Sequence, residues 1–325
     1  MKTRNLGRSH ISGYVTSAAL AFVSLGITAP LQIPHICIEV VRLVSIPNHV
    51  SNSYSVTNDS SAKASISVVI PTLNEAMNLP WVLRRMPSYV DEVVIVDGRS
   101  HDRTVDVARA LRMDVVVVNE PRKGKGIAVR SGFSAASGDI IVMLDADGSM
   151  DPQEIGWFLS PLQHDFDFVK GSRYVTGGGS EDLTWLRNVG NKVLTELANA
   201  ALRSNYSDLC YGYIALRREC LDVLQLESDG FEIETELIVR AARAGLRIAE
   251  VPSIELDRIS GTSNLQTFRD GWRVLRTLAR ESTWEAPTAG ARPEALRRLK
   301  YRYPDVRFSR TPTDPHSVLA MAEGA

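Results

Sequence analysis

The sequence contains few cysteines. Of its 325 residues only Cys37, Cys210 and Cys220 are cysteines, and no two of them form a Cys-x-x-Cys pair. That spacing argues against a structural zinc site, and so small and odd a number argues against a disulfide framework. We therefore expect the protein to fold in a reducing compartment, which fits the cytoplasm.

An excess of charge of one sign is also absent. The chain has 37 basic and 38 acidic residues, which gives a formal net charge of -1. Nucleic-acid-binding domains usually have a strong basic excess, so no nucleic-acid partner is expected. The hydrophobic content of 44% and charged content of 23% are ordinary for a globular protein, and the length allows one large domain or two small ones.

The first 64 residues differ in composition from the rest. Lys2, Arg4 and Arg8 precede residues 11–35, which carry no charge, and residues 51–64 are rich in Ser, Asn and Thr. A basic start before an apolar stretch resembles a signal peptide or a short membrane anchor. We favour a third interpretation, an unstructured extension that ends in a linker. The predicted organisation is an extension over residues 1–64, a catalytic domain over 65–282 and a peripheral tail over 283–325.

From residue 65 onward, short apolar runs alternate with helical patterns. Strands are predicted at 65–70, 92–96, 114–118, 139–144, 166–170 and 247–251, and helices at 75–85, 102–111, 124–136, 183–203, 234–244 and 267–280. Alternating, continuously apolar strands and helices predict an α/β fold, Rossmann-like, with a mainly parallel sheet covered by helices on both faces. Ligands of such sheets bind beyond the carboxyl ends of the strands, so residues 71–75, 97–100 and 145–149 should line one crevice.

The clearest candidate site is Asp145-Ala146-Asp147, directly after the strand predicted at 139–144. Two carboxylates one residue apart can share Mg²⁺ or Mn²⁺, which prefer oxygen ligands and leave coordination positions for phosphate oxygens. The cation would neutralise charge on a departing diphosphate. The alternative is an acid pair that caps the helix beginning near Pro152.

Other polar residues lie at equivalent positions. Asp97 ends the second strand and can accept hydrogen bonds from a base or ribose, although Asp-Gly is also a turn signal. Glu75 follows the first strand and can instead be an acid at a helix N-terminus. Lys123-Gly-Lys125-Gly126 opens a helix, whose amides and two cations suit a phosphate or nucleotide.

Four segments together resemble family 2 glycosyltransferases of the GT-A (nucleotide-diphospho-sugar transferase) fold. They are Pro71-Thr-Leu-Asn-Glu75, Val96-Asp97-Gly-Arg-Ser-His-Asp-Arg-Thr104, Gly124-Lys-Gly-Ile-Ala128 and Leu144-Asp-Ala-Asp147, in the family's order and spacing. The resemblance implies an inverting glycosyltransferase with a nucleotide-sugar donor and Mg²⁺ or Mn²⁺. It implies that the donor is bound by Pro71, Thr72, Asn74, Glu75, Asp97, Lys125, Asp145, Ala146 and Asp147. Of these, Asp145 and Asp147 would bind the metal, and Asp147 is also a candidate catalytic residue.

The second half of the chain resembles the polyprenyl (dolichyl) phosphate mannose or glucose synthase branch. The segments are Lys170-Gly-Ser-Arg-Tyr174, Asp208-Leu-Cys-Tyr-Gly-Tyr213, Phe231-Glu-Ile-Glu-Thr-Glu236 and Arg258-Ile-Ser-Gly-Thr-Ser-Asn264. This branch implies transfer of mannose or glucose to a polyprenyl phosphate. Arg173, Arg187 and Arg258 are the candidates that grip the acceptor phosphate, since guanidinium binds phosphate in a forked geometry.

Several alternatives stay open at this point. Ser149 and Asn264 depart from the pattern of that branch, so the donor can be GDP-mannose, UDP-glucose or another sugar nucleotide. The acceptor can also be soluble, such as a phosphorylated small acid, a natural product or another glycan precursor. We expect a cytoplasmic enzyme with peripheral contact to the inner face of the membrane.

Glu232, Glu234 and Glu236 form a group of alternating acids. If the acceptor is a hydroxyl, one of them, with Glu234 our candidate, can be the base that removes its proton. If the acceptor is a phosphate, they instead bind the arginines of the site. We favour the second interpretation.

Overall fold

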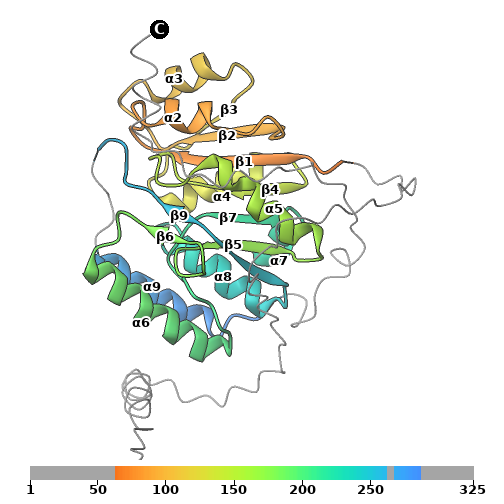
Figure 1. The fold of residues 1–325 in the computed structure, drawn as a ribbon, viewed down its shortest axis with the longest axis vertical. Helices are drawn as coiled ribbons and strands as arrows, with labels where there is room; N and C mark the ends of the chain where they lie inside the picture. The colour runs from red at the N-terminus through yellow and green to blue at the C-terminus, as the bar shows by residue number, and fades with distance from the viewer. Residues whose placement is uncertain (1–62, 262–266, 287–325) are drawn as a thin grey trace, which may run out of the picture. The chain divides into compact units, whose positions relative to one another are not determined.

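The computed structural model describes residues 63–261 and 267–286. Most of the extension predicted over 1–64, Asn264, and most of the tail predicted over 283–325 lie outside these residues. The main sheet has seven strands in the order β3-β2-β1-β4-β7-β5-β8, and β6 and β9 form a separate pair. Figure 1 shows the strands from β3 to β5 in this order, from top to bottom. No helix in the described part of the chain is long and apolar enough to cross a membrane.

The elements follow the predicted alternation of strands and helices. In chain order they are β1 (Ile66–Thr72), α2 (Leu79–Arg84), β2 (Glu92–Asp97), α3 (Thr104–Leu111), β3 (Val116–Asn119), α4 (Lys125–Ala135), β4 (Ile140–Met143), η1 (Pro152–Glu154), α5 (Ile155–Gln163), β5 (Phe168–Ser172), β6 (Gly179–Ser180), α6 (Trp185–Leu202), β7 (Ile214–Arg217), α7 (Cys220–Leu224), α8 (Ile233–Arg243), β8 (Ile248–Pro252), β9 (Ile254–Glu255) and α9 (Thr267–Glu281).

The prediction of a mainly parallel sheet is confirmed. β1 pairs in parallel with β2 and β4, β2 with β3, and β5 with β8. β7, which the sequence did not predict, lies antiparallel between β4 and β5. Four residues, Ile-Ala-Leu-Arg, are too short a run to show a period, so only pairing with two neighbours defines this strand.

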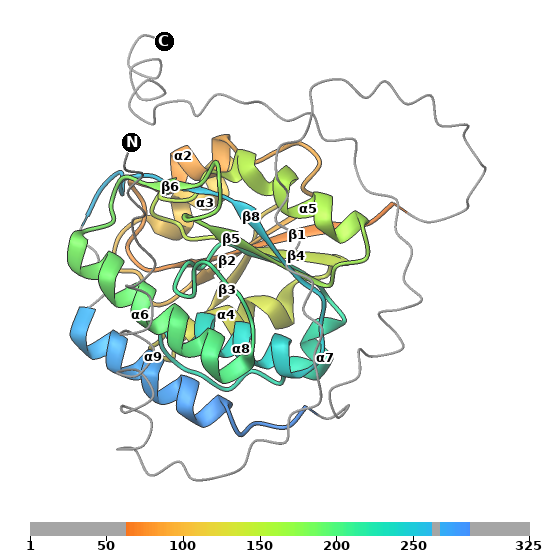
Figure 2. The same ribbon diagram turned by 60° about the horizontal axis from the view of Figure 1, so that its bottom comes forward.

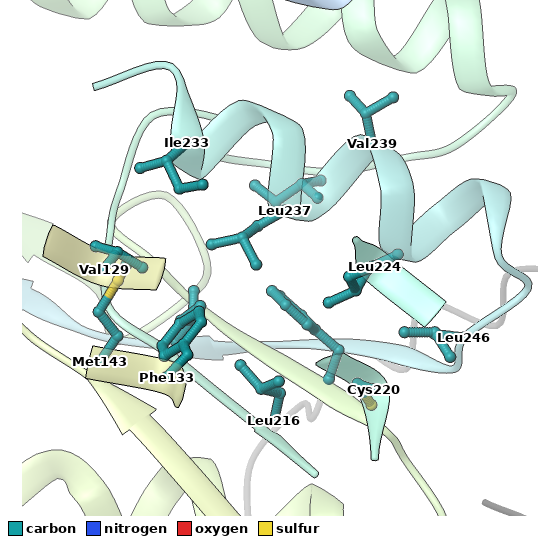
Figure 3. Close-up of a cluster of buried hydrophobic side chains, with 14 of the residues drawn as sticks. Val129, Phe133, Met143, Leu216, Cys220, Leu224, Ile233, Leu237, Val239 and Leu246 are labelled. Atoms are coloured by element: carbon teal, nitrogen blue, oxygen red, sulfur yellow. The ribbon is translucent and has the colours of Figure 1, made fainter. Parts of the chain in front are cut away.

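Side chains of β1 alternate between two cores, one on each face of the sheet. Ile66, Val68 and Ile70 pack with residues of α2, α3 and α5, whereas Val69 packs with residues of α4, α6, α8 and α9. Figure 3 shows part of the second core, where side chains of α4 and α8 meet those of β4 and β7. The prediction of helices on both faces is therefore confirmed.

One strand differs from its prediction. β3 lies at the edge of the sheet, and its four residues are exposed or half-buried. The run of valines suggested a strand buried on both faces, but an edge strand with one neighbour exposes more of its side chains.

The register brings three strand ends to one edge of the sheet. Thr72 of β1 pairs with Asp97 of β2, and Val69 of β1 pairs with Met143 of β4. The amide of Gly98 donates to the carbonyl of Thr72 at 2.9 Å, which joins the first two loops. The loops after β1, β2 and β4 therefore begin side by side, as the parallel topology requires.

Candidate active site

Lys125 joins the first carboxylate of the Asp-x-Asp pair to a distant helix. Its ammonium Nζ lies 2.7 Å from Asp145 Oδ1 and 2.8 Å from Glu234 Oε1. The same ammonium lies over the Phe231 ring, 5.7 Å from the ring centre. Lys125 and Glu234 are mostly buried, while Asp145 is 28% exposed. The cation thus bridges the loop after β4 and the first turn of α8.

Two glycines allow α4 to begin close to the loop before α8. A Cβ on Gly124 would lie 2.1 Å from the carbonyl oxygen of Asp229, and a Cβ on Gly126 would lie 2.2 Å from that of Ser228. Gly124 also has a φ of 144°, which other residues rarely adopt. These close contacts place Lys125 against the start of α8.

Two amides in the first turn of α4 are already engaged within the chain. Gly126 N and Ile127 N both donate to the carbonyl of Asp229, at 2.9 and 3.3 Å. Because a donor already bound to a carbonyl cannot also bind a phosphate well, the expectation that these two amides bind a phosphate is wrong. The charges of the two predicted cations, Lys123 and Lys125, are left for this role.

Arg258 neutralises the second carboxylate of the pair. Its Nη2 lies 2.7 Å from Asp147 Oδ2, and its Nη1 lies 3.1 Å from Glu75 Oε1. Asp147 Oδ1 accepts hydrogen bonds from the amide and hydroxyl of Ser149, at 3.0 and 2.6 Å. The loop that carries Arg258 is joined to the Asp147 loop by Ile259 N, which donates to the Asp147 carbonyl at 3.1 Å. Glu75, Asp147 and Arg258, widely separated in the sequence, therefore form one cluster.

The loops after β1 and β2 form the other side of this region. Asn74 has a φ of 59°; its amide donates to the Ser100 hydroxyl at 2.8 Å, and Ser100 N donates to Asp97 Oδ2 at 3.1 Å. The Thr72 hydroxyl donates to the Val96 carbonyl at 3.2 Å. Asp97 Oδ1 is buried without a hydrogen-bond partner among the described residues. A buried carboxylate oxygen of this kind suits a ligand N–H or O–H.

Burial and pairing shift the pKa values of these groups. Burial lowers the pKa of Lys125, but Asp145 and Glu234 together outweigh it, so this pKa lies above the usual range for lysine. Burial raises the pKa of Glu234 despite the nearby Lys125 ammonium. It also raises the pKa of Glu75, although Asn78 and Arg258 act in the opposite direction. Lys125 therefore remains a cation.

The donor chemistry of the Asp-x-Asp loop fits a divalent cation that also binds a phosphate. Asp145 and Asp147 offer hard carboxylate oxygens, and both already face positive charge. Within residues 63–261 and 267–286 no group of three or more His, Cys, Asp or Glu side chains is arranged as a complete metal site. The capping alternative is wrong for this pair, because Asp151 accepts from Gln153 N and caps the helix after it.

Arg173 lies in a separate buried network. Its Nε and Nη2 donate to both oxygens of Asp208, at 2.7 and 2.9 Å, and its Nη1 donates to Glu255 at 3.0 Å. Its guanidinium also lies over the Tyr211 ring, at 5.0 Å. One planar face and the edges of the guanidinium are thus engaged by side chains of this chain. The two carboxylates hold the guanidinium in place, and the observed contacts of Arg173 do not reach Asp145 or Asp147.

Arg187 and the remaining acids lie elsewhere. Arg187 Nη1 is 3.1 Å from Asp182, near the start of α6. Glu236 is buried and lies 2.9 Å from Arg240, whereas Glu232 accepts from Gly230 N at 3.1 Å. Of the three alternating acids, Glu234 is the one that contacts a predicted site residue.

Sequence reasoning missed residues whose role is steric or reaches across the fold. A Cβ on Gly212 would lie 2.5 Å from Glu234 Oε1, so only glycine leaves room for this carboxylate. Asn78, at the start of α2, donates to the Ser260 carbonyl at 3.1 Å and also to Glu75. It thus links the start of α2 to the loop that carries Arg258. The family resemblance of residues 208–213 marked the segment that contains Gly212, but the sequence did not show that this glycine contacts Glu234.

Comparison with known proteins identifies the family. The family model "Glycosyl transferase family 2" matches residues 67–224. The glycosyltransferase AglJ of Haloferax volcanii is 32% identical over 68% of this chain and 73% of its own length. The chain belongs to glycosyltransferase family 2. It is an enzyme with the GT-A fold, as the motifs predicted.

Two further relatives are named for different acceptors. The dolichol-phosphate mannosyltransferase of Pyrococcus furiosus is 32% identical over 68% of this chain, and this chain spans 64% of that protein. The crystal structure of glucosyl-3-phosphoglycerate synthase from Mycobacterium tuberculosis, in complex with Mn²⁺, UDP and glucosyl-3-phosphoglycerate, is 26% identical. It has a TM-score of 0.54 and covers 67% of this chain and 80% of that chain. One relative is thus named for a lipid phosphate and the other for a soluble phosphorylated acid.

Proposed function

We propose that the enzyme transfers mannose or glucose from a nucleotide sugar to a polyprenyl phosphate, with a divalent cation bound by Asp145 and Asp147. The observation that carries this proposal is the pairing of these two carboxylates with Lys125 and Arg258 at the carboxyl ends of the strands. Such an arrangement brings two acids and two cations to one place, which suits a diphosphate and its metal ion.

The donor nucleoside would lie against the loops after β1 and β2. Asp97 supports this placement, because its buried Oδ1 can accept a hydrogen bond from the base or ribose. Pro71 and Thr72 end the neighbouring strand, and Asn74 and Glu75 follow in its loop. Ala146 is buried between the two acids and sets their spacing.

The metal, when bound, would neutralise negative charge on the diphosphate. With that ion on Asp145 and Asp147, Lys125 would be free to neutralise the leaving diphosphate, and Arg258 would be free to bind the acceptor phosphate. Glu234 keeps Lys125 in the crevice through the 2.8 Å contact. This supports the interpretation that Glu234 binds a cation of the site, a lysine rather than the arginine that we expected.

The acceptor phosphate would attack the anomeric carbon from the face opposite the leaving nucleotide, which inverts that carbon. A phosphate is ionised at neutral pH and needs little help from a general base. Arg258 is the candidate to align it, because this guanidinium already lies beside Asp147. Arg173 and Arg187 remain proposals, and the carboxylates bound to Arg173 favour a supporting role for it.

The test is transfer of labelled sugar from GDP-mannose and UDP-glucose to a short polyprenyl phosphate, with Mg²⁺ or Mn²⁺. Asp147→Asn keeps the side-chain shape and an acceptor for Ser149 but removes the charge. We expect transfer to fall about 100-fold or more, since a metal ion supplies several kcal/mol of charge stabilisation. Asp106→Asn, at an acid 68% exposed on α3, is the matched control and should be fully active. Full activity of Asp147→Asn would overturn the assignment.

A second candidate keeps the donor site but replaces the lipid with a soluble phosphorylated acid. The likeness to glucosyl-3-phosphoglycerate synthase over 80% of that chain favours it. In the same assay, label that stays in the aqueous phase with 3-phosphoglycerate as acceptor would support this candidate. Label that moves into the organic phase would support the polyprenyl phosphate.

A further inference from the structure

Helix α6 exposes a row of large apolar side chains. Trp185 is 77% exposed, Leu186 42%, Val189 40% and Val193 54%. At about 100° per residue these four positions fall within an arc of about 100°. The buried residues of the helix, which include Asn191 and Ala198, lie on the opposite side. The row therefore points away from the protein core.

Helix α9 exposes arginines on one side. Arg269 and Arg276 are exposed, and the side chains of Arg273 and Arg280 are 40% and 54% exposed. At about 100° per residue these four positions also fall within an arc of less than about 90°. The two acids of α9, Asp270 and Glu281, are buried, at 5% and 1% exposure; Asp270 pairs with Arg273, and Glu281 pairs with Arg280 and with Arg240. Four arginines against two buried acids leave this side of the helix with a net positive charge.

The two helices that carry these side chains are neighbours. Figures 1 and 2 both show α6 and α9 side by side, and Figure 2 turns this pair of helices toward the viewer. Trp272, 62% exposed, lies on α9 next to the arginines. Exposed tryptophan beside arginine is the composition of helices that lie in the interface of an anionic membrane, where the ring enters the headgroup region and the cations meet lipid phosphates.

We propose that the outer faces of α6 and α9 form a docking surface for an anionic lipid bilayer. This docking surface rests on the proposed function, because it would give the enzyme a way to reach a lipid acceptor. The connection to the site is short. α6 begins soon after β6, β6 pairs with β9, and Arg258 follows β9 within a few residues. Docking on α6 would thus bring the bilayer surface close to the loop that carries Arg258.

The test uses the full chain and sedimentation with vesicles of phosphatidylcholine alone or mixed with phosphatidylglycerol. We expect binding to the mixed vesicles that weakens at high salt. Each arginine near an anionic surface contributes on the order of fivefold in binding, so Arg269→Gln with Arg276→Gln should weaken binding about 25-fold. Trp185→Ser with Val193→Ser should weaken it on the order of tenfold or more, because apolar area no longer enters the bilayer.

The controls are substitutions of the same kinds at exposed positions flanking α3. Arg103→Gln removes an arginine that is 84% exposed, and Met113→Ser removes an apolar side chain that is 94% exposed. Both should bind vesicles like the wild type. Residues 1–62 are present in every variant, so the comparison isolates the effect of α6 and α9.

Three results would overturn the docking surface. The first is no binding of the wild type to mixed vesicles, and the second is equal binding of the α6 and α9 variants. The third is a dimer in sedimentation equilibrium that the α6 variant converts to a monomer, because a second copy would then cover this face. Transfer to polyprenyl phosphate dispersed in detergent is measured in parallel. A wild-type enzyme that transfers sugar but does not bind mixed vesicles would overturn the docking surface alone, whereas a wild type that binds vesicles but does not transfer would support the surface and overturn the lipid acceptor.

Discussion

Replacement of Lys125 by methionine tests the central ion cluster. Methionine keeps most of the aliphatic volume of the lysine but removes its charge. Lys125 and Glu234 are only 12% and 14% exposed, and their charged atoms are 2.8 Å apart. The substitution would therefore leave the carboxylate of Glu234 buried without its cation. Asp145 is 28% exposed and can regain water more easily.

The loss can be estimated from burial. Removal of one partner of a buried ion pair costs about 3–5 kcal/mol, whereas a pair with an exposed partner contributes about 0–1 kcal/mol. Lys125→Met should thus lower the free energy of unfolding by about 3–5 kcal/mol, nearly all through Glu234. For a domain of this size the melting temperature falls by about 2–4 °C per kcal/mol, so the expected shift is about 10 °C.

The assay is a double-mutant cycle with Lys125→Met, Glu234→Gln and the combined variant, each measured by thermal unfolding and sugar transfer. The combined variant should recover most of the stability, because a neutral amide replaces the stranded carboxylate. It should not recover transfer, since the proposed role of Lys125 requires its charge. Unchanged stability of Lys125→Met, or full transfer by the combined variant, would refute the reasoning.

Three further predictions concern Gly212, Asp97 and Glu154. Gly212→Ala should reduce kcat/KM for transfer and lower stability by about 1–3 kcal/mol, because the new Cβ would lie 2.5 Å from Glu234 Oε1; kinetics equal to the wild type would contradict this. Asp97→Asn should weaken binding of the donor's nucleoside diphosphate, in calorimetry, by about 5- to 150-fold, since one acceptor oxygen becomes a donor; unchanged affinity would exclude contact with Asp97. Burial raises the pKa of Glu154 to about 8 from its usual 4.5. Between these two pH values the folded state retains a proton that the unfolded chain releases. The free energy of unfolding therefore falls as pH rises from about 4.5 to 8. Glu154→Gln should match the wild type near pH 4 and exceed its melting temperature above about pH 8; parallel melting curves across this range would disprove the shift.

The sequence by itself determined the parallel part of the sheet and the positions of the strand-end acids. Hydrophobic periodicity and turn residues act over a few positions, so they were sufficient to predict β1, β2 and β4, to place Asp97 at the end of a strand and to place Asp145 and Asp147 just after one. The same local signals predicted α4, α6, α8 and α9 to within a few residues. The combination of motifs was also sufficient to identify the family.

Only the tertiary structure decided which charges meet. Glu234 lies 109 residues from Lys125, and Arg258 lies 183 residues from Glu75, so no local pattern records either contact. Both contacts form because the start of α8 and the loop that carries Arg258 pack against the Asp-x-Asp loop. The same packing buried Arg173 between two carboxylates and engaged the amides of Gly126 and Ile127 with the Asp229 carbonyl. Local sequence specifies backbone conformation, whereas the choice of ionic partners depends on distances that exist only after the sheet and helices have packed.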